Sequence, residues 1–266
     1  NYEIIVMVMS ALYYRKYIGP VELYCNQPIK NYLVKNNLDQ YWDKVDTDIS
    51  LEFDKIKNPM APFMYGAFKN YVIEYIKAPF ILMDHDFMFK SAIPSELLEC
   101  DVRFLHLEEK DLETYLPHAD PDFGWGGTKY DNWDVDKIAN TGAVYFNNQD
   151  FSHKFSTNMT NYYRNIFGRD ARSDQRVYFD QQFFMMLLEI EGLEVNTFSN
   201  LIFNPITKEF VRQSDDPLKE QVKWYHLWIT KHFLRYGHTA AFFDRMKHEL
   251  GSVFPKEYNN LKYLFK

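Results

Sequence analysis

Blocks of apolar and polar residues alternate along the chain and predict helices and strands in turn. The predicted helices cover residues 4–17, 28–35, 62–77, 150–167, 179–190, 232–250 and 255–265. The predicted strands cover residues 21–25, 41–45, 79–89, 102–107, 140–147 and 193–198. Because strands alternate with helices, the pattern predicts an α/β sandwich with a mostly parallel central sheet.

Two longer stretches lack such periodicity and predict irregular structure. Residues 46–61 combine acids, lysines and proline, which is typical of a loop. Residues 110–139 are rich in glycine, proline, tryptophan and acids. A loop of that length in a compact domain is usually functional or mobile, so we interpret it as an acceptor or lid segment. We expect one domain over residues 1–266, closed at its C-terminus by the helices of 232–266.

The predicted strand at 79–89 carries a pair of acids inside an apolar run. After four apolar residues, Asp84 and Asp86 stand on either side of His85. Side chains at i and i+2 share a face near the end of a strand, so the two carboxylates can converge on one cation. Open α/β sheets also bind ligands at the carboxyl ends of their strands. A metal site is one interpretation, and a strand that ends in a solvated turn is the other.

Composition narrows the class of protein. The 266 residues, of which 46% are hydrophobic, suit one folded domain, and a net charge of -7 gives no strong nucleic-acid signal. Cys25 and Cys100 provide neither a disulfide framework nor a cysteine zinc site and are typical of a reducing compartment. No apolar run reaches the about 18 residues of a membrane span. We therefore expect a cytoplasmic protein, either free or peripheral at a membrane.

Five motifs follow one another in an order that resembles a known family. They are Lys69 on a predicted helix, Asp84-His-Asp86, Asn140-Thr-Gly-Ala-Val-Tyr-Phe-Asn147, Asp180-Gln181 at a helix start, and His226-Leu-Trp-Ile-Thr-Lys231. Together they resemble the nucleotide-sugar-dependent glycosyltransferases of the GT-A fold, in particular the glycogenin-like and lipopolysaccharide-galactosyltransferase-like retaining enzymes. The resemblance spans about residues 20–235, and no single motif is specific. It implies a Rossmann-like GT-A sandwich.

The chain departs from this family in two places. Relatives begin with a strand and a loop that hold the nucleoside base, and residues 4–9 are either an abbreviated form of that strand or part of the first helix. We prefer the second interpretation, in which the usual first strand is missing. The C-terminal motif of relatives, His-x-x-Gly-x-x-Lys-Pro-Trp, is present only as His226 to Lys231, without its glycine and one residue shorter.

The resemblance implies a divalent cation bound by Asp84, Asp86 and His226. Cleavage of a sugar–diphosphate bond leaves charge on the phosphate, and a bound divalent ion stabilises that charge as a Lewis acid. Oxygen ligands suit Mn²⁺ or Mg²⁺, and a histidine among them favours Mn²⁺. The alternative for His226 is a packed histidine in the aromatic cluster of residues 224–228.

Four further residues would bind the donor. Lys69 and Lys231 would donate to its phosphates or sugar hydroxyls, and Lys231 would also act in catalysis. Asn140 and Gly142 would form the far wall of the sugar pocket, since glycine permits close backbone approach and asparagine offers both a donor and an acceptor. The simpler alternative for Lys69 and Lys231 is that they are solvated surface lysines. For Asn140 and Gly142 it is a turn that precedes a strand.

The remaining candidates concern catalysis and the acceptor. Asp180 and Gln181 resemble the acid–amide pair that faces the reacting sugar carbon in relatives, although an acid that opens a helix is also an ordinary cap. We expect His85 to point away from the metal. Glu108 and Glu109 could face the acceptor, although exposed acids after a strand need no function.

Three classes of function are compatible with these patterns. The favoured one is a glycosyltransferase that moves a sugar from a nucleotide-sugar donor, most simply a UDP-sugar, to a hydroxyl acceptor such as a glycan or lipid-linked sugar. Analogy with the resembling family suggests that the anomeric configuration of the sugar is retained. A metal-dependent phosphoesterase could use the two acids with His226 and His232, but the chain lacks the dense His and Asp clusters of such sites. The third class is a non-catalytic sugar- or nucleotide-binding module.

Overall fold

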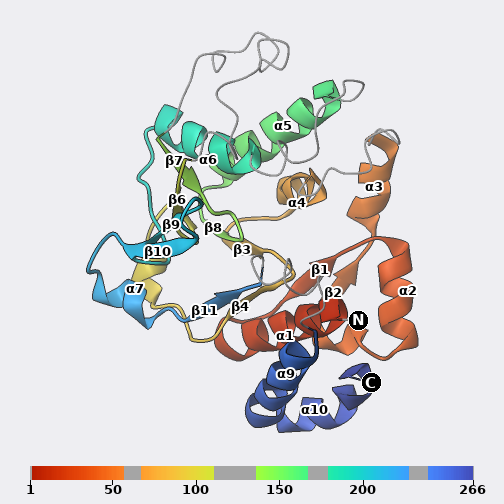
Figure 1. Cartoon of the computed structure of the whole chain (residues 1–266). Helices are drawn as coiled ribbons and strands as arrows, with labels where there is room; N and C mark the ends of the chain where they lie inside the picture. Colours follow the sequence, from red (N-terminus) through yellow and green to blue (C-terminus); the bar gives the residue numbers. More distant parts are fainter. Residues whose placement is uncertain (1, 57–66, 111–135, 167–178, 228–238, 266) are drawn as a thin grey trace.

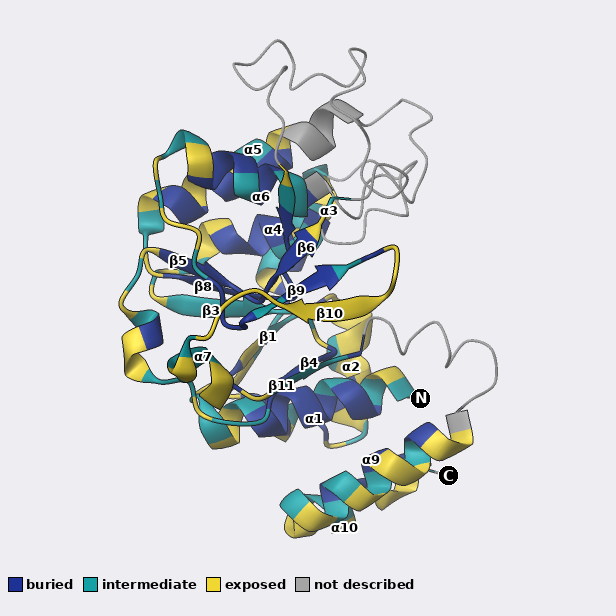
Figure 2. Ribbon diagram, turned by 60° about the vertical axis from the view of Figure 1, so that its left-hand side comes forward, coloured by how far each residue is buried: buried dark blue, intermediate teal, exposed yellow. Residues whose placement is uncertain are grey.

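The computed structural model describes residues 2–56, 67–110, 136–166, 179–227 and 239–265, a mixed α/β structure (Figure 1). Its helices are α1 (Tyr2–Tyr17), α2 (Gln27–Lys35), α3 (Asp48–Ile56), α4 (Ala67–Val72), α5 (Gln149–Ile166), α6 (Phe179–Ile190), α7 (Pro217–Gln221), α9 (Thr239–Val253) and α10 (Pro255–Leu261), with 3₁₀ turns η1 (Asp39–Tyr41), η2 (Ile73–Tyr75), η3 (Ser95–Leu98) and η5 (Lys262–Phe265). The strands lie in the middle, with α4, α5 and α6 on one side and α1, α9 and α10 on the other (Figures 1 and 2).

The described strands form four small sheets. They are β1 (Glu22–Tyr24) with β2 (Lys44–Asp46), the trio β3 (Phe80–Met83), β8 (Ala143–Phe146) and β5 (Val102–Phe104), the pair β11 (Trp224–His226) and β4 (Phe87–Phe89), and the four strands β10 (Glu209–Arg212), β9 (Leu201–Asn204), β6 (Leu107–Glu109) and β7 (Lys137–Ala139). Among these ladders only β1–β2 and β6–β9 are parallel.

Within the described ranges, the mostly parallel central sheet of the sequence prediction is therefore not observed. In particular, β3 and β5 both pair with β8 in the antiparallel direction. An unbroken apolar run indicates that a strand is buried on both faces. It contains no information about the direction of the neighbouring strands, which explains why the prediction and the structure differ.

The predicted strand at 79–89 is two strands that belong to different sheets. The chain turns at residues 84–86, where the N–H of Phe87 donates to the carbonyl of Asp84 at 3.0 Å. After this turn β4 pairs with β11 instead of continuing alongside β8. The predicted strand at 102–107 is likewise divided into β5 and β6. Both divisions place polar residues at the breaks, which is where the candidate site forms.

Two other predictions about elements are wrong. The predicted loop at 46–61 contains α3, because Ile49, Phe53 and Ile56 have helical spacing and the Phe53 ring packs 5.5 Å from the ring of Phe68. The predicted strand at 193–198 makes only one isolated bridge, between Phe104 and Thr197. The hairpin of β9 and β10 follows it instead, and its turn is held by the Asn204 side chain, which accepts from two backbone N–H groups.

The other predicted helices agree with the structure within the described ranges. Asn26 caps α2, since its side chain accepts from the N–H of Ile29 at 3.1 Å. The helix predicted at 62–77 is described from Ala67 onward and tightens into η2. Gly192 has φ +65° and ends α6 in the left-handed conformation that glycine adopts most easily. Residues 111–135 of the predicted acceptor or lid segment lie outside the described residues.

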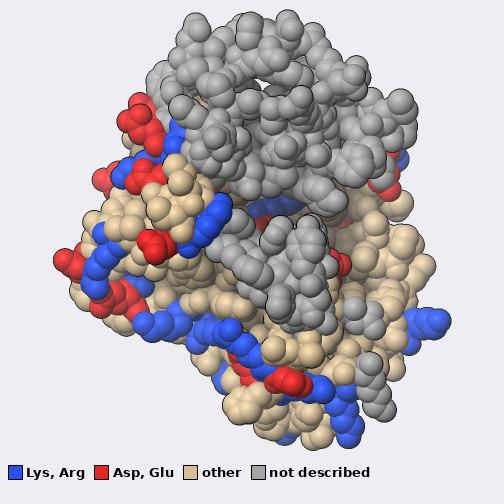
Figure 3. All heavy atoms as spheres, in the orientation of Figure 1, with Lys and Arg blue, Asp and Glu red and all other residues tan. Residues whose placement is uncertain are grey.

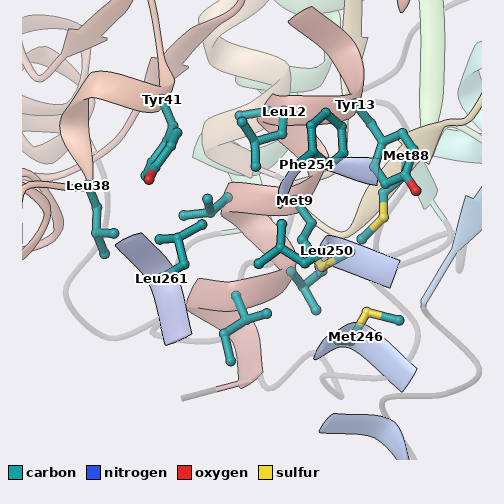
Figure 4. Packing of buried hydrophobic residues seen from close by; sticks show 14 of the residues in the cluster. Met9, Leu12, Tyr13, Leu38, Tyr41, Met88, Met246, Leu250, Phe254 and Leu261 are labelled. Atoms are coloured by element: carbon teal, nitrogen blue, oxygen red, sulfur yellow. The ribbon is translucent and has the colours of Figure 1, made fainter. Parts of the chain in front are cut away.

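Two apolar cores hold the layers together. Between the sheet and the helices α5 and α6, the ring of Phe184 lies 5.2–5.7 Å from the rings of Phe104, Phe151 and Phe155. On the other side, α9 and α10 pack against α1 (Figure 4) through residues that include Met9, Leu12, Tyr13, Met246, Leu250, Phe254 and Leu261. The first of these cores positions the strands that carry the site.

Two surface properties bear on partners. No described helix combines the length and the apolar content that crossing a membrane requires. On the face in Figure 3, Lys and Arg side chains are interspersed with Asp and Glu. The described part of this face therefore carries both signs of charge.

Candidate metal centre

The three predicted metal ligands come together at the break between β3 and β4. Asp84 and Asp86 lie in the turn, and β11 brings His226 opposite Phe87 of β4. The N–H of Leu227 donates to the carbonyl of Asp86 at 3.2 Å, which holds the end of β11 against the turn. As a result, Nε2 of His226 lies 3.6 Å from Oδ2 of Asp84 and 3.8 Å from Oδ1 of Asp86.

This arrangement fits a divalent cation. One ligand atom from each of the three side chains lies within 4.8 Å of the others. A cation bound at about 2.1 Å holds its ligand atoms roughly 3–4.3 Å apart, so small side-chain movements complete the site. Two carboxylate oxygens and one imidazole nitrogen are a donor set that accepts Mn²⁺ or Mg²⁺. Asp86 and the His226 ring are almost completely shielded from water, with side-chain exposures of 3% and 5%.

Lys69 of α4 contacts one of these acids directly. Its ammonium group lies 2.7 Å from Oδ1 of Asp84 and also donates to the carbonyl of Thr141. Burial alone would raise the pKa of Asp84, but Lys69 and His226 outweigh it and hold that pKa well below its usual range. Asp84 is thus ionised, with Oδ1 toward Lys69 and Oδ2 toward His226. The predicted contact of Lys69 with donor phosphate stays a prediction.

The segment between β7 and β8 lies against the same acids. The N–H of Asp84 donates to the carbonyl of Gly142 at 2.8 Å. Oδ1 of Asn140 accepts from the N–H of Gly142 at 3.0 Å, and its Nδ2 donates to the buried Glu108 at 2.5 Å. A Cβ atom on Gly142 would lie 2.5 Å from Cε1 of His226. The absence of a side chain at Gly142 is therefore what allows His226 to approach the acids.

Asp180 opens α6 close enough to Lys69 and Asp84 to interact with both electrostatically. It is buried, accepts from the side chain of Asn70 at 3.4 Å, and accepts from the N–H of Gln181 at 2.9 Å. Burial, with a smaller contribution from Asp84, raises the pKa of Asp180 to about 6, while Lys69 and Asn70 oppose this. Asp180 thus changes charge close to neutral pH. Gln181 is half-buried beside it.

His106, which sequence reasoning missed, is buried beside this centre. It lies between β5 and β6, and its ring stacks on Trp224 at 5.7 Å and meets the edge of Phe210 at 5.1 Å. Burial lowers the pKa of His106 to about 3, so the ring is neutral. A lone histidine in an otherwise apolar strand pattern was the only available signal.

The other candidates lie nearby or outside the described residues. His85 is exposed between the two acids, and Glu109 is exposed at the end of β6. Glu108 is buried against Asn140. Lys231 and His232 fall in the range 228–238, which lies outside the described residues.

The chain matches no protein-family model, no curated protein and no solved structure.

Proposed function

We propose that the chain is a metal-dependent glycosyltransferase of GT-A architecture, which moves a sugar from a nucleotide-sugar donor, most simply a UDP-sugar, to a hydroxyl-bearing acceptor. The observation that carries the proposal is the convergence of Asp84, Asp86 and His226, three residues that the family-like motifs single out. His226 lies far from the two acids in the sequence, and Lys69 joins the group through Asp84. A packed aromatic cluster alone would not require two acids against the His226 ring.

The donor set suits the charge of a nucleoside diphosphate. When bound by Asp84, Asp86 and His226, Mn²⁺ or Mg²⁺ would supply Lewis-acid stabilisation of the leaving diphosphate. Buried Asp86 and half-buried Asp84 concentrate negative charge, so the protein itself binds a diphosphate poorly without a cation. Lys69 compensates part of that charge and fixes the orientation of Asp84.

The surrounding residues support binding and positioning of the sugar. Asn140 and Gly142 form the wall beside the two acids, and the Asn140 amide is oriented by Glu108. Above pH 6 Asp180 is an anion, which stabilises the positive charge that develops at a sugar carbon during transfer. Asp180 and Gln181 would therefore face the reacting carbon, and Lys231 would contact the departing diphosphate. Retention of configuration would follow the family that the motifs resemble.

Thermal unfolding in the presence of UDP and Mn²⁺ tests this proposal. We expect UDP with Mn²⁺ to stabilise the protein more than either alone, by about 2.7 kcal/mol at 100 times the dissociation constant. That corresponds to a rise of roughly 5–11 °C in Tm. Asp86→Asn should abolish the effect of Mn²⁺ on UDP binding. His85→Asn is the matched control, because His85 is the adjacent residue and is exposed.

Two outcomes would contradict the proposal and identify another class. Stabilisation by Mn²⁺ to which UDP adds nothing would favour a phosphoesterase. Stabilisation by UDP-sugars that is independent of metal, and unchanged in Asp86→Asn, would favour a non-catalytic binding module.

A further inference from the structure

Arg103 is a buried cation that forms no ion pair with any carboxylate in the part of the chain that the structure describes. It lies on β5 with 5% of its surface exposed. Its guanidinium donates from Nε to the carbonyl of Leu97 and from Nη1 to the carbonyl of Thr197 at 2.6 Å. It also lies over the ring of Phe198. A buried charge ordinarily has a charged partner, and two carbonyls and an aromatic ring compensate this one only in part.

A second cation reaches the same place from α7. Nζ of Lys219 donates to Oγ1 of Thr197 at 3.2 Å, so Thr197 contacts Lys219 through its hydroxyl and Arg103 through its carbonyl. Lys219 is half-buried, and both burial and the neighbouring Arg103 lower its pKa. Asp216 opposes this shift, but it forms no ion pair with Lys219. Two positive groups are thus held together although they repel each other.

Both cations retain N–H groups that a ligand can use. Arginine has five N–H donors and lysine has three, and the bonds to Leu97 and Thr197 occupy only some of them. The other neighbour of the guanidinium is the half-buried thiol of Cys100. Burial raises the pKa of this thiol, and Arg103 beside it opposes that rise. Guanidinium and ammonium donors of this kind suit the oxygens of a phosphate group.

We propose that Arg103 and Lys219 bind a phosphate oxyanion, either the free ion or the phosphate group of a larger molecule. The anion accepts hydrogen bonds from the remaining N–H groups of both side chains, which replaces their mutual repulsion by attraction to a shared partner. A dianion matches the two positive charges, which favours phosphate over a carboxylate. The inference goes beyond the proposed function, because it does not depend on Asp84, Asp86 or His226.

Charge-selective alkylation of Cys100 detects an anion at this place. Iodoacetate is an anion and iodoacetamide is neutral, so the ratio of their reaction rates with Cys100 reports the local positive charge. In the metal-free protein at constant ionic strength, inorganic phosphate should slow the reaction with iodoacetate more than the reaction with iodoacetamide. Mass spectrometry of the digested protein separates Cys100 from the buried Cys25.

Glycerol phosphate, tested in parallel, distinguishes the two sources of the phosphate group. Protection of Cys100 by both compounds shows that the site accepts a phosphorylated molecule. Protection by inorganic phosphate alone shows that its ligand is the free ion. Either result supports a phosphate site formed by Arg103 and Lys219.

Variants of Lys219 assign the effect to this pair of cations. Lys219→Met should raise the phosphate concentration that halves the iodoacetate rate by about 10–100-fold, as loss of a hydrogen bond to a charged group does. Lys219→Arg keeps the charge and should stay close to the parent. Lys223→Met is the matched control, because it removes the same charge from an exposed position near α7.

Two results would overturn the proposal. The first is a parent protein in which phosphate does not slow the reaction of Cys100 with iodoacetate, and this measurement requires no variant. The second is a folded Lys219→Met in which phosphate protects Cys100 at the same concentration as in the parent. Equal weakening in Lys219→Met and Lys223→Met would also contradict it, because the effect would then come from overall charge.

Discussion

Gly142→Ala should disable the candidate metal centre through one methyl group. The added Cβ would lie 2.5 Å from Cε1 and 2.9 Å from Nδ1 of His226, whereas ordinary contacts begin at 3.4 Å. The ring must therefore move by about 1 Å, and metal sites tolerate deviations of only about 0.2 Å in ligand distance. Gly142 is not among the glycines with positive φ, so alanine fits its backbone and the effect is purely steric.

We expect Gly142→Ala to weaken Mn²⁺ binding by about 10–100-fold, as loss of correct ligand orientation does elsewhere. Overpacking should also lower the free energy of unfolding by about 1–3 kcal/mol. Isothermal titration with Mn²⁺ and urea unfolding measure the two quantities. Gly251→Ala is the matched control, because its added Cβ would meet only Tyr258 at 3.8 Å within a helix. It should leave Mn²⁺ binding unchanged and stabilise the protein by up to about 1 kcal/mol.

A double-mutant cycle separates the steric explanation from general damage. In a His226→Ala background the contact with the ring is gone, so Gly142→Ala should cost less stability than it does in the parent. The contact with Oδ1 of Asn140 at 2.9 Å remains and sets the residual cost. Equal stability costs in both backgrounds, or parental Mn²⁺ affinity in Gly142→Ala, would refute the reasoning.

Three further predictions concern groups around the site and in the core. The raised pKa of Asp180, about 6 against an ordinary 3.8, means that the folded state holds its proton more tightly, so stability falls as pH rises from 4 to 6 and then levels off. The free energy of unfolding of Asp180→Asn, measured with urea, should therefore equal that of the parent at pH 4 and exceed it by about 2–3 kcal/mol at pH 7.5. Equal free energies of unfolding at both pH values would tell against this. Lys69→Met removes the partner of the Asp84 carboxylate and should lower the free energy of unfolding by about 1–3 kcal/mol. The control in the same assay is Lys55→Met, because the ion pair of Lys55 with Glu52 is exposed and should contribute under about 1 kcal/mol. Phe184→Ala should cost about 3–5 kcal/mol because the ring is fully buried among phenylalanines, and a cost near zero would mean that this core is misassigned.

The sequence predicts most helices of this fold and the residues of the candidate centre. Helices α5 and α6 have apolar residues at helical spacing, whereas α1 is apolar on nearly all sides and is followed by Gly19-Pro20. The acids of residues 84–86 stand out because polar residues inside an apolar run need a partner. Their meeting with His226 was expected from the family resemblance, since nothing in the local sequence links β11 to β4.

Other features depend on contacts that local patterns do not encode. The antiparallel pairing of β3 and β5 with β8 depends on the path of the connections between these strands. An apolar run in the sequence is the same for a parallel and an antiparallel strand. The role of Gly142 could be assigned only to close backbone approach, whereas the structure identifies the neighbour as the ring of His226. His106 was missed because its position beside the centre depends on its contacts with Trp224 and Phe210, which are distant in the sequence.

Turnover of UDP-sugars tests the central proposal most directly. The purified protein would be incubated with Mn²⁺, a panel of UDP-hexoses and hydroxyl acceptors, with UDP release and glycosylated products measured by chromatography and mass spectrometry. We predict Mn²⁺-dependent UDP release in proportion to product, abolished in Asp86→Asn and retained in His85→Asn. A folded parent that binds Mn²⁺ but releases no UDP from any of these donors, or releases it equally in Asp86→Asn, would contradict the account.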